Sequence, residues 1–349
     1  MTMKRRPAAR QRPDAKLQVC LLLVVLFLVV FVVGFVRWVA PSSSSSSASQ
    51  PTPLRSALHS EVWLPAGTRQ KPGYHAVGGA SVHKRLQSES TAAFSSLHLL
   101  QHKQVSHDTY YLGKHAHPHH GYEMEGYAFL HMHEKAARTP GPNLTKKVHF
   151  NRSEQHIVGC AAPIAEATYW KRSRGYWIHA QNRHAMSDEF VREAYAAAAD
   201  RWQCALDSVA VVPAGPFLGF VDGAMDTSVP TGRNEMAFGS IHGRPGTVAV
   251  TISWGVFGGP LATRHLSEYK LLFDEQQYQW GDGARKRSVM DLQAVATHEL
   301  GHSLGLDDIY TSACTHVTMF GSSSEGATEK RTLEDEDVAG IQRLYKGVS

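Results

Sequence analysis

The chain has 349 residues, of which 42% are hydrophobic, and this is long enough for a core of one or two domains. Its formal net charge is +5. The first sixteen residues contain six Lys or Arg and one Asp, so their net charge of +5 equals that of the whole chain. The remainder is near neutral, which excludes an extended basic surface for binding nucleic acid.

Residues 17–36 form an uncharged apolar run in which only Gln18 is strongly polar. A helix rising ~1.5 Å per residue over this length crosses a ~30 Å hydrocarbon layer. A cleaved signal peptide is the competing interpretation, but its apolar part is ordinarily ~7–15 residues long and Pro41 directly follows the candidate cleavage site. The basic tail, residues 1–16, favours a cytoplasmic N-terminus. We therefore expect a type II membrane protein whose C-terminal part is extracellular or lumenal, with a secreted form arising if the chain is cut after the span.

Residues 37–52 are rich in Ser and have too little apolar surface to fold, so we interpret them as a stalk. Residues 53–164 are the least regular part, and their position suggests a regulatory or pro-like region ahead of a C-terminal domain. Sequons for N-glycosylation at Asn143 and Asn151 agree with a lumenal location and a glycoprotein. Within this region, residues 122–130 are strand-like.

The same region is rich in histidine, and two interpretations stay open. The first is a second metal site, and the second is a solvated loop. We favour the loop because the histidines lack helical spacing and such tracts bind metals weakly. The residues concerned are His115, His117, His119, His120, His131 and His133.

From residue 165 to residue 349 the pattern is that of an α+β domain. Ser187 is placed to cap a helix whose apolar positions, from Val191 to Trp202, are three and four residues apart. Short runs of β-branched and aromatic residues predict strands. Together they imply a twisted mixed sheet with three helices. The strand-like runs are residues 176–178, 209–212, 247–254 and 269–273.

The sequence from Thr297 to Asp308 carries the strongest chemical signal. His298 and His302 are four residues apart, so on a helix both imidazoles face one ion. Glu299 lies beside the first of them, where it can act as a general base. Gly305 permits a left-handed turn that ends the helix and returns Asp308 towards the metal.

This extended motif, HExxHxxGxxD, resembles the signature of the metzincin metalloproteases. Residues 291–297, 331–333 and 337–345 resemble the closing part of the matrixin catalytic domain, and the similarity covers roughly residues 165 to 347. Asp308 stands where vertebrate matrixins have His, a variant that microbial relatives use. Asp307 is a rival ligand, but its offset is one residue short.

The resemblance implies a metzincin-like catalytic domain with a five-stranded mixed sheet, three helices and a Met-turn at Met319. It also implies a metalloendopeptidase with one catalytic Zn²⁺ held by His298, His302 and Asp308, and with Glu299 as the general base. Gly321 replaces the Pro usual two residues after the Met of this turn. Calcium is a further family cofactor, although no calcium loop can be mapped here.

The strand 248–254 would form the upper rim of the cleft, where a protein or peptide substrate adds as an antiparallel strand. The alternative function is a catalytically silent surface protein that uses the metzincin scaffold for adhesion or metal binding. Glu299 argues against that alternative, because a binding module does not need a general base.

Four cysteines are present, and Cys20 falls in the predicted membrane span. Cys160 begins a Cys-x-x-Pro sequence similar to the matrixin cysteine switch, in which a propeptide thiolate occupies the zinc. The flanking Arg and Gly of that switch are missing. We therefore favour a disulfide from Cys160 to Cys204 or to Cys314.

Overall fold

The computed structural model describes residues 94–137, 159–206 and 215–346. They belong to one compact unit, Ser90–Ser349. Within these ranges no helix combines the length and apolar character needed to cross a membrane. Several predicted features lie outside the described residues, namely the basic tail, the membrane span at 17–36, the stalk at 37–52, the sequons at Asn143 and Asn151, and the strand at 209–212.

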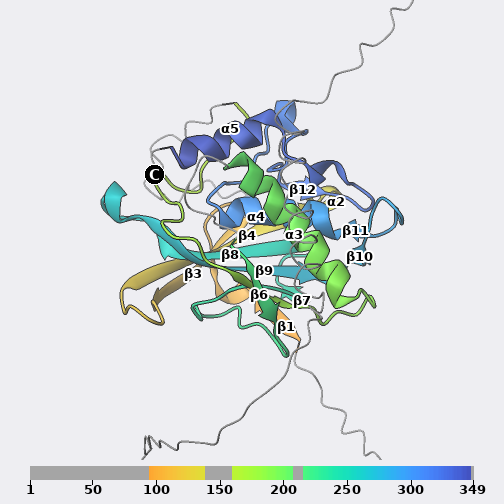
Figure 1. The fold of residues 1–349 in the computed structure, drawn as a ribbon, viewed down its shortest axis with the longest axis horizontal. Helices are drawn as coiled ribbons and strands as arrows, with labels where there is room; N and C mark the ends of the chain where they lie inside the picture. The colour runs from red at the N-terminus through yellow and green to blue at the C-terminus, as the bar shows by residue number, and fades with distance from the viewer. Residues whose placement is uncertain (1–93, 138–158, 207–214, 347–349) are drawn as a thin grey trace, which may run out of the picture. The chain divides into compact units, whose positions relative to one another are not determined.

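A mixed ten-stranded sheet dominates the fold (Figure 1). Eight strands follow the order β2-β3-β4-β8-β9-β7-β5-β6, while β1 pairs with β7 and β12 pairs with β4. β10 and β11 form a separate parallel pair. The strands are β1 Ser95–His98, β2 Lys103–Gln104, β3 Thr109–Ala116, β4 Glu123–His133, β5 Tyr176–His179, β6 Phe217–Phe220, β7 Asn234–His242, β8 Thr247–Val256, β9 His265–Asp274, β10 Trp280–Gly281, β11 Met290–Asp291 and β12 Ser322–Ser323.

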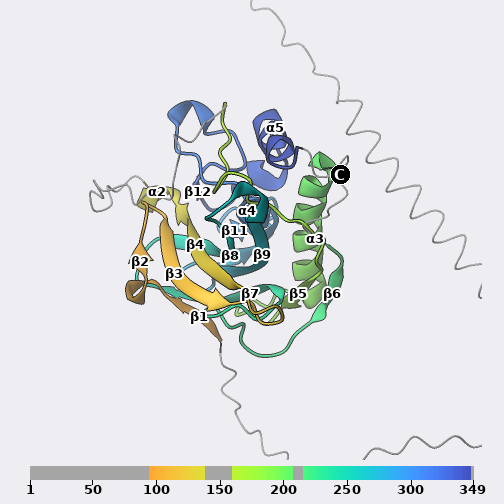
Figure 2. The same ribbon diagram turned by 90° about the vertical axis from the view of Figure 1, so that its left-hand side faces the viewer.

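Three long helices and one single-turn helix accompany the sheet. α3 and α5 lie on one side of the molecule and β2 to β4 on the other, with α4 between them (Figure 2). The helices are α2 Glu134–Ala137, α3 Asp188–Ala205, α4 Leu292–Ser303 and α5 Asp335–Leu344, and the short 3-10 turns are Leu99–Gln101, Leu261–Thr263, Ser312–Cys314 and Glu329–Arg331. The mixed α+β architecture that the sequence predicted is confirmed.

Helix α3 forms as its sequence predicts. The Ser187 hydroxyl accepts a hydrogen bond from the backbone N of Phe190 at 3.2 Å, which satisfies one of the free donors of the first turn. The expected apolar face is buried from Val191 to Trp202. This face packs on α4, so α3 supports the helix that carries the metal-binding motif.

The sheet separates two groups of buried side chains. One group joins α3, α4 and α5 to residues such as Phe238 and Phe273. The other lies on alternate strand positions such as Val250 and Leu272, with Leu97 and Leu99 of the N-terminal segment. Because both faces are covered, the central strands are buried on both sides.

The expected five-stranded sheet is too small. Six strands come from residues after 165, namely β5 to β9 in the order β8-β9-β7-β5-β6 together with β12, and residues 95–133 add four more. Residues 94–137 fall in the region predicted to precede the C-terminal domain, yet they pair with its strands. A domain boundary at residue 164 therefore does not separate this segment from the rest of the sheet.

The solvated loop that we favoured for the histidine-rich region is also wrong for part of it. His131 and His133 lie on β4 and are buried, and His117 is buried as well. His119 and His120 are exposed in the turn between β3 and β4. Side chains along β4 alternate between the two faces of the sheet, and both faces are buried. The apolar pattern of the sequence alone does not indicate that a histidine on such a strand is buried.

A buried charge cluster links β7 and β9. The Lys270 ammonium lies 3.1 Å from Glu268, contacts Glu235 and donates to the Thr231 hydroxyl at 2.7 Å. His179 lies 3.2 Å from the other oxygen of Glu235. Although burial raises the pKa of Glu235, His179 and Lys270 lower it to about 2. Lys270 is fully buried, so its charge is needed to balance the two carboxylates.

We predict that Lys270→Met lowers the free energy of unfolding by about 3–5 kcal/mol, because it removes the buried ammonium that Glu235 and Glu268 share. Lys114→Met is the control, since Lys114 and Glu123 form an exposed ion pair, and its unfolding should change little. Urea unfolding followed by tryptophan fluorescence measures both. Equal midpoints for the two variants would contradict this role of Lys270.

Candidate metal centre

Helix α4 brings His298, Glu299 and His302 together in the interior. Its first turn is capped by Asp291, whose carboxylate accepts from the backbone N of Ala294 at 2.8 Å. All three side chains are 0% exposed. The Nε2 atoms of the two histidines are 3.1 Å apart, as expected for imidazoles one turn apart on one helix face.

Both imidazoles are oriented by backbone carbonyls. The Nδ1 of His298 donates to the carbonyl of Thr318 at 2.8 Å, and the Nδ1 of His302 donates to that of Leu306 at 2.9 Å. These bonds leave each Nε2 with a lone pair directed at the shared site. Such outer partners fix the ring orientation and tautomer that metal binding needs.

The turn at Gly305 returns Asp308 to the two histidines. Gly305 has φ +105°, which a side chain rarely adopts, and the backbone N of Leu306 bonds to the carbonyl of Gly301 at 3.0 Å. Asp308 Oδ1 lies 3.2 Å from His298 Nε2, and its Oδ2 lies 3.4 Å from His302 Nε2. The rival residue, Asp307, accepts from the backbone N of Asp308 instead.

The spacing of these atoms fits a tetrahedral zinc. Zinc–nitrogen bonds of about 2.0–2.1 Å place neighbouring ligand atoms about 3.3 Å apart, and the observed separations are 3.1, 3.2 and 3.4 Å. Both oxygens of Asp308 and Oε1 of Glu299 are buried without a conventional hydrogen-bond partner in the described part of the chain. Buried polar atoms in native proteins ordinarily have partners, so these residues fit a metal ion.

The charges at the site also suit a cation. Burial and Lys330 lower the pKa of His298 to about 4. Burial opposes protonation of His302 too, but Asp308 raises its pKa to about 9, so without a metal its Nε2 holds a proton that metal binding would displace. Burial would raise the pKa of Asp308, yet the two histidines hold it well below its usual range. Asp308 is therefore an anionic oxygen donor beside two imidazoles.

Glu299 is held by β8 next to this group. The Thr251 hydroxyl lies 2.6 Å from Glu299 Oε2 and 2.9 Å from the Glu299 carbonyl oxygen. Burial raises the pKa of Glu299 to about 7. A carboxyl group with a pKa near neutrality can both accept and return a proton. Residue spacing provides no signal for Thr251, because its role depends on the packing of β8 on α4.

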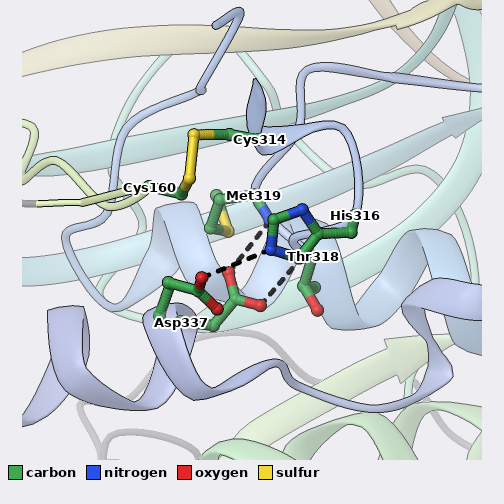
Figure 3. The surroundings of a disulfide bond; sticks show 7 residues. Cys160, Cys314, His316, Thr318, Met319 and Asp337 are labelled. Carbon is green, nitrogen blue, oxygen red and sulfur yellow. Dashed lines mark hydrogen bonds and ion pairs between the residues drawn. A yellow bond between two sulfur atoms is a disulfide. The ribbon is translucent and has the colours of Figure 1, made fainter. Parts of the chain in front are cut away.

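Met319 lies under α4. A Cβ at Gly301 would be 2.2 Å from the sulfur of Met319, so the glycine is required for this close approach. Asp337 of α5 fixes the backbone here, accepting from the N atoms of Thr318 at 2.8 Å and Met319 at 3.2 Å (Figure 3). Thr318 in turn provides the carbonyl that orients His298.

Asp337 is a residue that the sequence analysis missed. Glu334 and Asp337 form a capping box at the start of α5, in which each side chain accepts from the backbone N of the other residue. The acidic residue at its third position also binds the backbone of residues 318 and 319, which sequence spacing does not reveal.

Cys160 and Cys314 form a disulfide with a Cα–Cα distance of 5.5 Å (Figure 3). This agrees with one of the two pairings that we favoured, and Cys204 is exposed and outside the bond. Because the Cys160 sulfur is bonded to Cys314, it does not supply a thiolate to the histidine cluster. The disulfide instead joins the segment of residues 159–163 to the segment before Met319. The first of these segments pairs with the turn after α4.

A cavity of about 900 Å³ lies nearby. Its walls include Tyr310, His316, Ser323 and Lys330. None of His298, Glu299, His302 or Asp308 lines it. The metal-binding residues are buried and form no part of the walls of this cavity.

Comparison with known proteins finds similarity to one family over part of the chain. Residues 251–346 match the model described as matrixin. Matrilysin of Rattus norvegicus is 41% identical over 73 residues, which cover 21% of this chain and 25% of the relative. Matrilysin of Homo sapiens is 38% identical over 73 residues, which also cover 21% of this chain and 25% of the relative. Metalloendoproteinase 5-MMP of Arabidopsis thaliana is 43% identical over 60 residues, covering 17% of this chain and 16% of the relative. The chain spans about a quarter or less of the length of these relatives.

We predict that Asp337→Ala reduces the free energy of unfolding by roughly 3 kcal/mol, because it leaves the buried N–H groups of Thr318 and Met319 and the half-buried N–H of Glu334 without their acceptor. The matched control is Asp335→Ala, an exposed acidic residue of the same helix turn. Chemical unfolding measures both variants. If Asp335→Ala were as damaging as Asp337→Ala, helix charge would explain the effect and the anchoring role would be lost.

Proposed function

We propose, from the matrixin-type metzincin segment that this chain carries at residues 251–346, that the protein is a zinc-dependent metalloendopeptidase. The observation that carries the proposal is the convergence of His298, His302 and Asp308 beside Glu299. The match to a protease family covers the residues of the site, and the distances between their ligand atoms add a geometric argument to it.

His298, His302 and Asp308 would hold the zinc, and the buried carboxylate would offset part of its charge. When bound, Zn²⁺ polarises the scissile carbonyl and makes water a better nucleophile by lowering its pKa towards about 7. Glu299 accepts the proton of the attacking water on Oε1, the atom that has no hydrogen-bond partner among the described residues, and returns it to the leaving amine. Thr251 keeps the other oxygen in place.

Met319 serves as the packing floor of the site in this proposal and is not a ligand. Its sulfur lies against Gly301 on α4. A bulkier floor would push the helix and its two histidines away from Asp308. The Met-turn assigned to this segment from the resemblance is supported by that contact.

The substrate class is protein or peptide, bound as an extended strand. The catalytically silent alternative is less well supported, because Glu299 is fully buried with its Oε1 unbonded among the described residues, and a binding module does not need such a carboxylate. We further propose that residues 17–36 place the domain on the outer or lumenal side of a membrane. That placement is supported by the uncharged run and the basic tail before it.

Glu299→Gln should keep bound zinc and lose about 10²–10⁴-fold in peptide hydrolysis, which is the usual contribution of a general base. The assay uses a quenched fluorescent peptide library and the zinc-loaded chain, before and after limited proteolysis with trypsin. Cleavage by the parent should stop when a chelator removes the metal. A parent chain that binds one zinc and cleaves nothing in either condition would contradict the protease proposal.

Asp308→Ala should weaken zinc binding strongly, and Asp307→Ala should leave it nearly unchanged. The two residues are adjacent, and it is the Asp308 oxygens that lie 3.2 and 3.4 Å from the two histidines. Competition with a fluorescent zinc chelator gives both affinities. Equal losses in the two variants would refute the assignment of Asp308 as the third ligand.

A further inference from the structure

The strand that we expected to form the open rim of the cleft is not open. β4 runs antiparallel along β8, with Tyr127 opposite Ser253, Phe129 opposite Thr251 and His131 opposite Ala249. This is the place and direction predicted for an extended substrate adding to the rim. The expectation of a free rim was wrong, because residues of the chain itself occupy it.

The other edge of β4 is also paired. The backbone N of Leu130 donates to the carbonyl of Asp108 at 2.9 Å, and that of Met132 donates to Gly321 at 3.3 Å. β12, which follows Met319, runs parallel to residues 132 and 133. Residues 130–133 of β4 therefore lie between β8 on one side and, on the other, Asp108 and the segment that follows Met319.

The side chains of β4 that face α4 lie directly on the metal-binding residues. Phe129 stacks on His302, with ring centroids 5.2 Å apart and an angle of 18° between the rings. The His131 ring is centred 3.9 Å from that of His298. Residues 129 and 131 point to the same face because side chains alternate along a strand.

His131 has an atom available for a metal. Its Nε2 is hydrogen-bonded to the Ser323 hydroxyl at 2.8 Å, while its Nδ1 is buried and has no hydrogen-bond partner among the described residues. Ligand atoms of His131, His298 and Asp308 all lie within 4.8 Å of one another. The bond to Ser323 would leave the lone pair of Nδ1 for the metal.

We propose that β4 occupies the position of an extended substrate and that His131 is an additional ligand of the zinc. The inference rests on the proposed function, which supplies the metal. Structural zinc sites have four protein ligands, whereas catalytic sites keep one position open. With His131 bound, His298, His302 and Asp308 would form a closed site. The chain in this conformation is then latent, and hydrolysis requires β4 to leave the rim.

The test uses the full chain loaded with Co²⁺, which replaces zinc and reports its ligands by visible absorption. Adding a small hydroxamate, a bidentate metal ligand, should leave the parent spectrum unchanged, because no position is open. His131→Ala should open one, so that hydroxamate changes the spectrum and the metal dissociation constant rises at least about 10-fold. His120→Ala is the control, since His120 is exposed on the same histidine-rich segment.

A second variant keeps the test decisive if the alanine variant folds poorly. His131→Cys should give a sulfur-to-cobalt charge-transfer band, because a thiolate at this position would bind the metal. Absence of that band, together with a parent spectrum that responds to hydroxamate, would overturn the inference.

The outcomes separate this inference from the proposed function. A cobalt spectrum that depends on His131 supports the closed site, whether or not peptide is cleaved after trypsin treatment. A lack of cleavage after trypsin treatment would count against the protease alone. Peptide cleavage that depends on Glu299 but not on removal or displacement of β4 would leave the protease standing and overturn the latent strand.

Discussion

The four-residue spacing of His298 and His302 on α4 is the constraint on which the site depends. This spacing sets the two Nε2 atoms 3.1 Å apart. A third ligand atom for the metal must then come from beyond the helix. Gly305 provides that return, because its φ of +105° reverses the chain without steric cost. Asp308 consequently reaches both histidines. Replacing the glycine or changing the length of the turn would move the carboxylate away from the site.

Parts of the chain far from α4 hold this arrangement in place. Asp337 fixes the backbone that carries Thr318 and Met319, and the Thr318 carbonyl orients His298. The disulfide joins Cys160 and Cys314, which are 154 residues apart. It therefore links the segment that pairs with the turn after α4 to the segment that follows this turn. In the chain-entropy view, closing so long a loop stabilises the folded state by restricting the unfolded one, by roughly 5 kcal/mol.

The sequence predicted those features that depend on local spacing. It predicted α3 with its cap and buried face, the motif helix, the turn at Gly305 and the return of Asp308. It did not predict the position of β4, because pairing between residues 123–133 and 247–256 is set by tertiary contacts. It also missed Thr251 and Asp337, whose partners are 48 and 19 residues away. Histidines on β4 were mistaken for a loop because burial of a polar side chain depends on partners that local patterns do not show.

The central claim is a single zinc held between α4, the turn after it and β4. A crystal structure of the zinc-loaded chain with an anomalous difference map tests it most directly. The account predicts one strong peak about 2.0–2.2 Å from His298 Nε2, His302 Nε2 and a carboxylate oxygen of Asp308, with His131 Nδ1 completing the shell. A peak elsewhere, for example among His117, His119 and His120, with none beside α4, would contradict it.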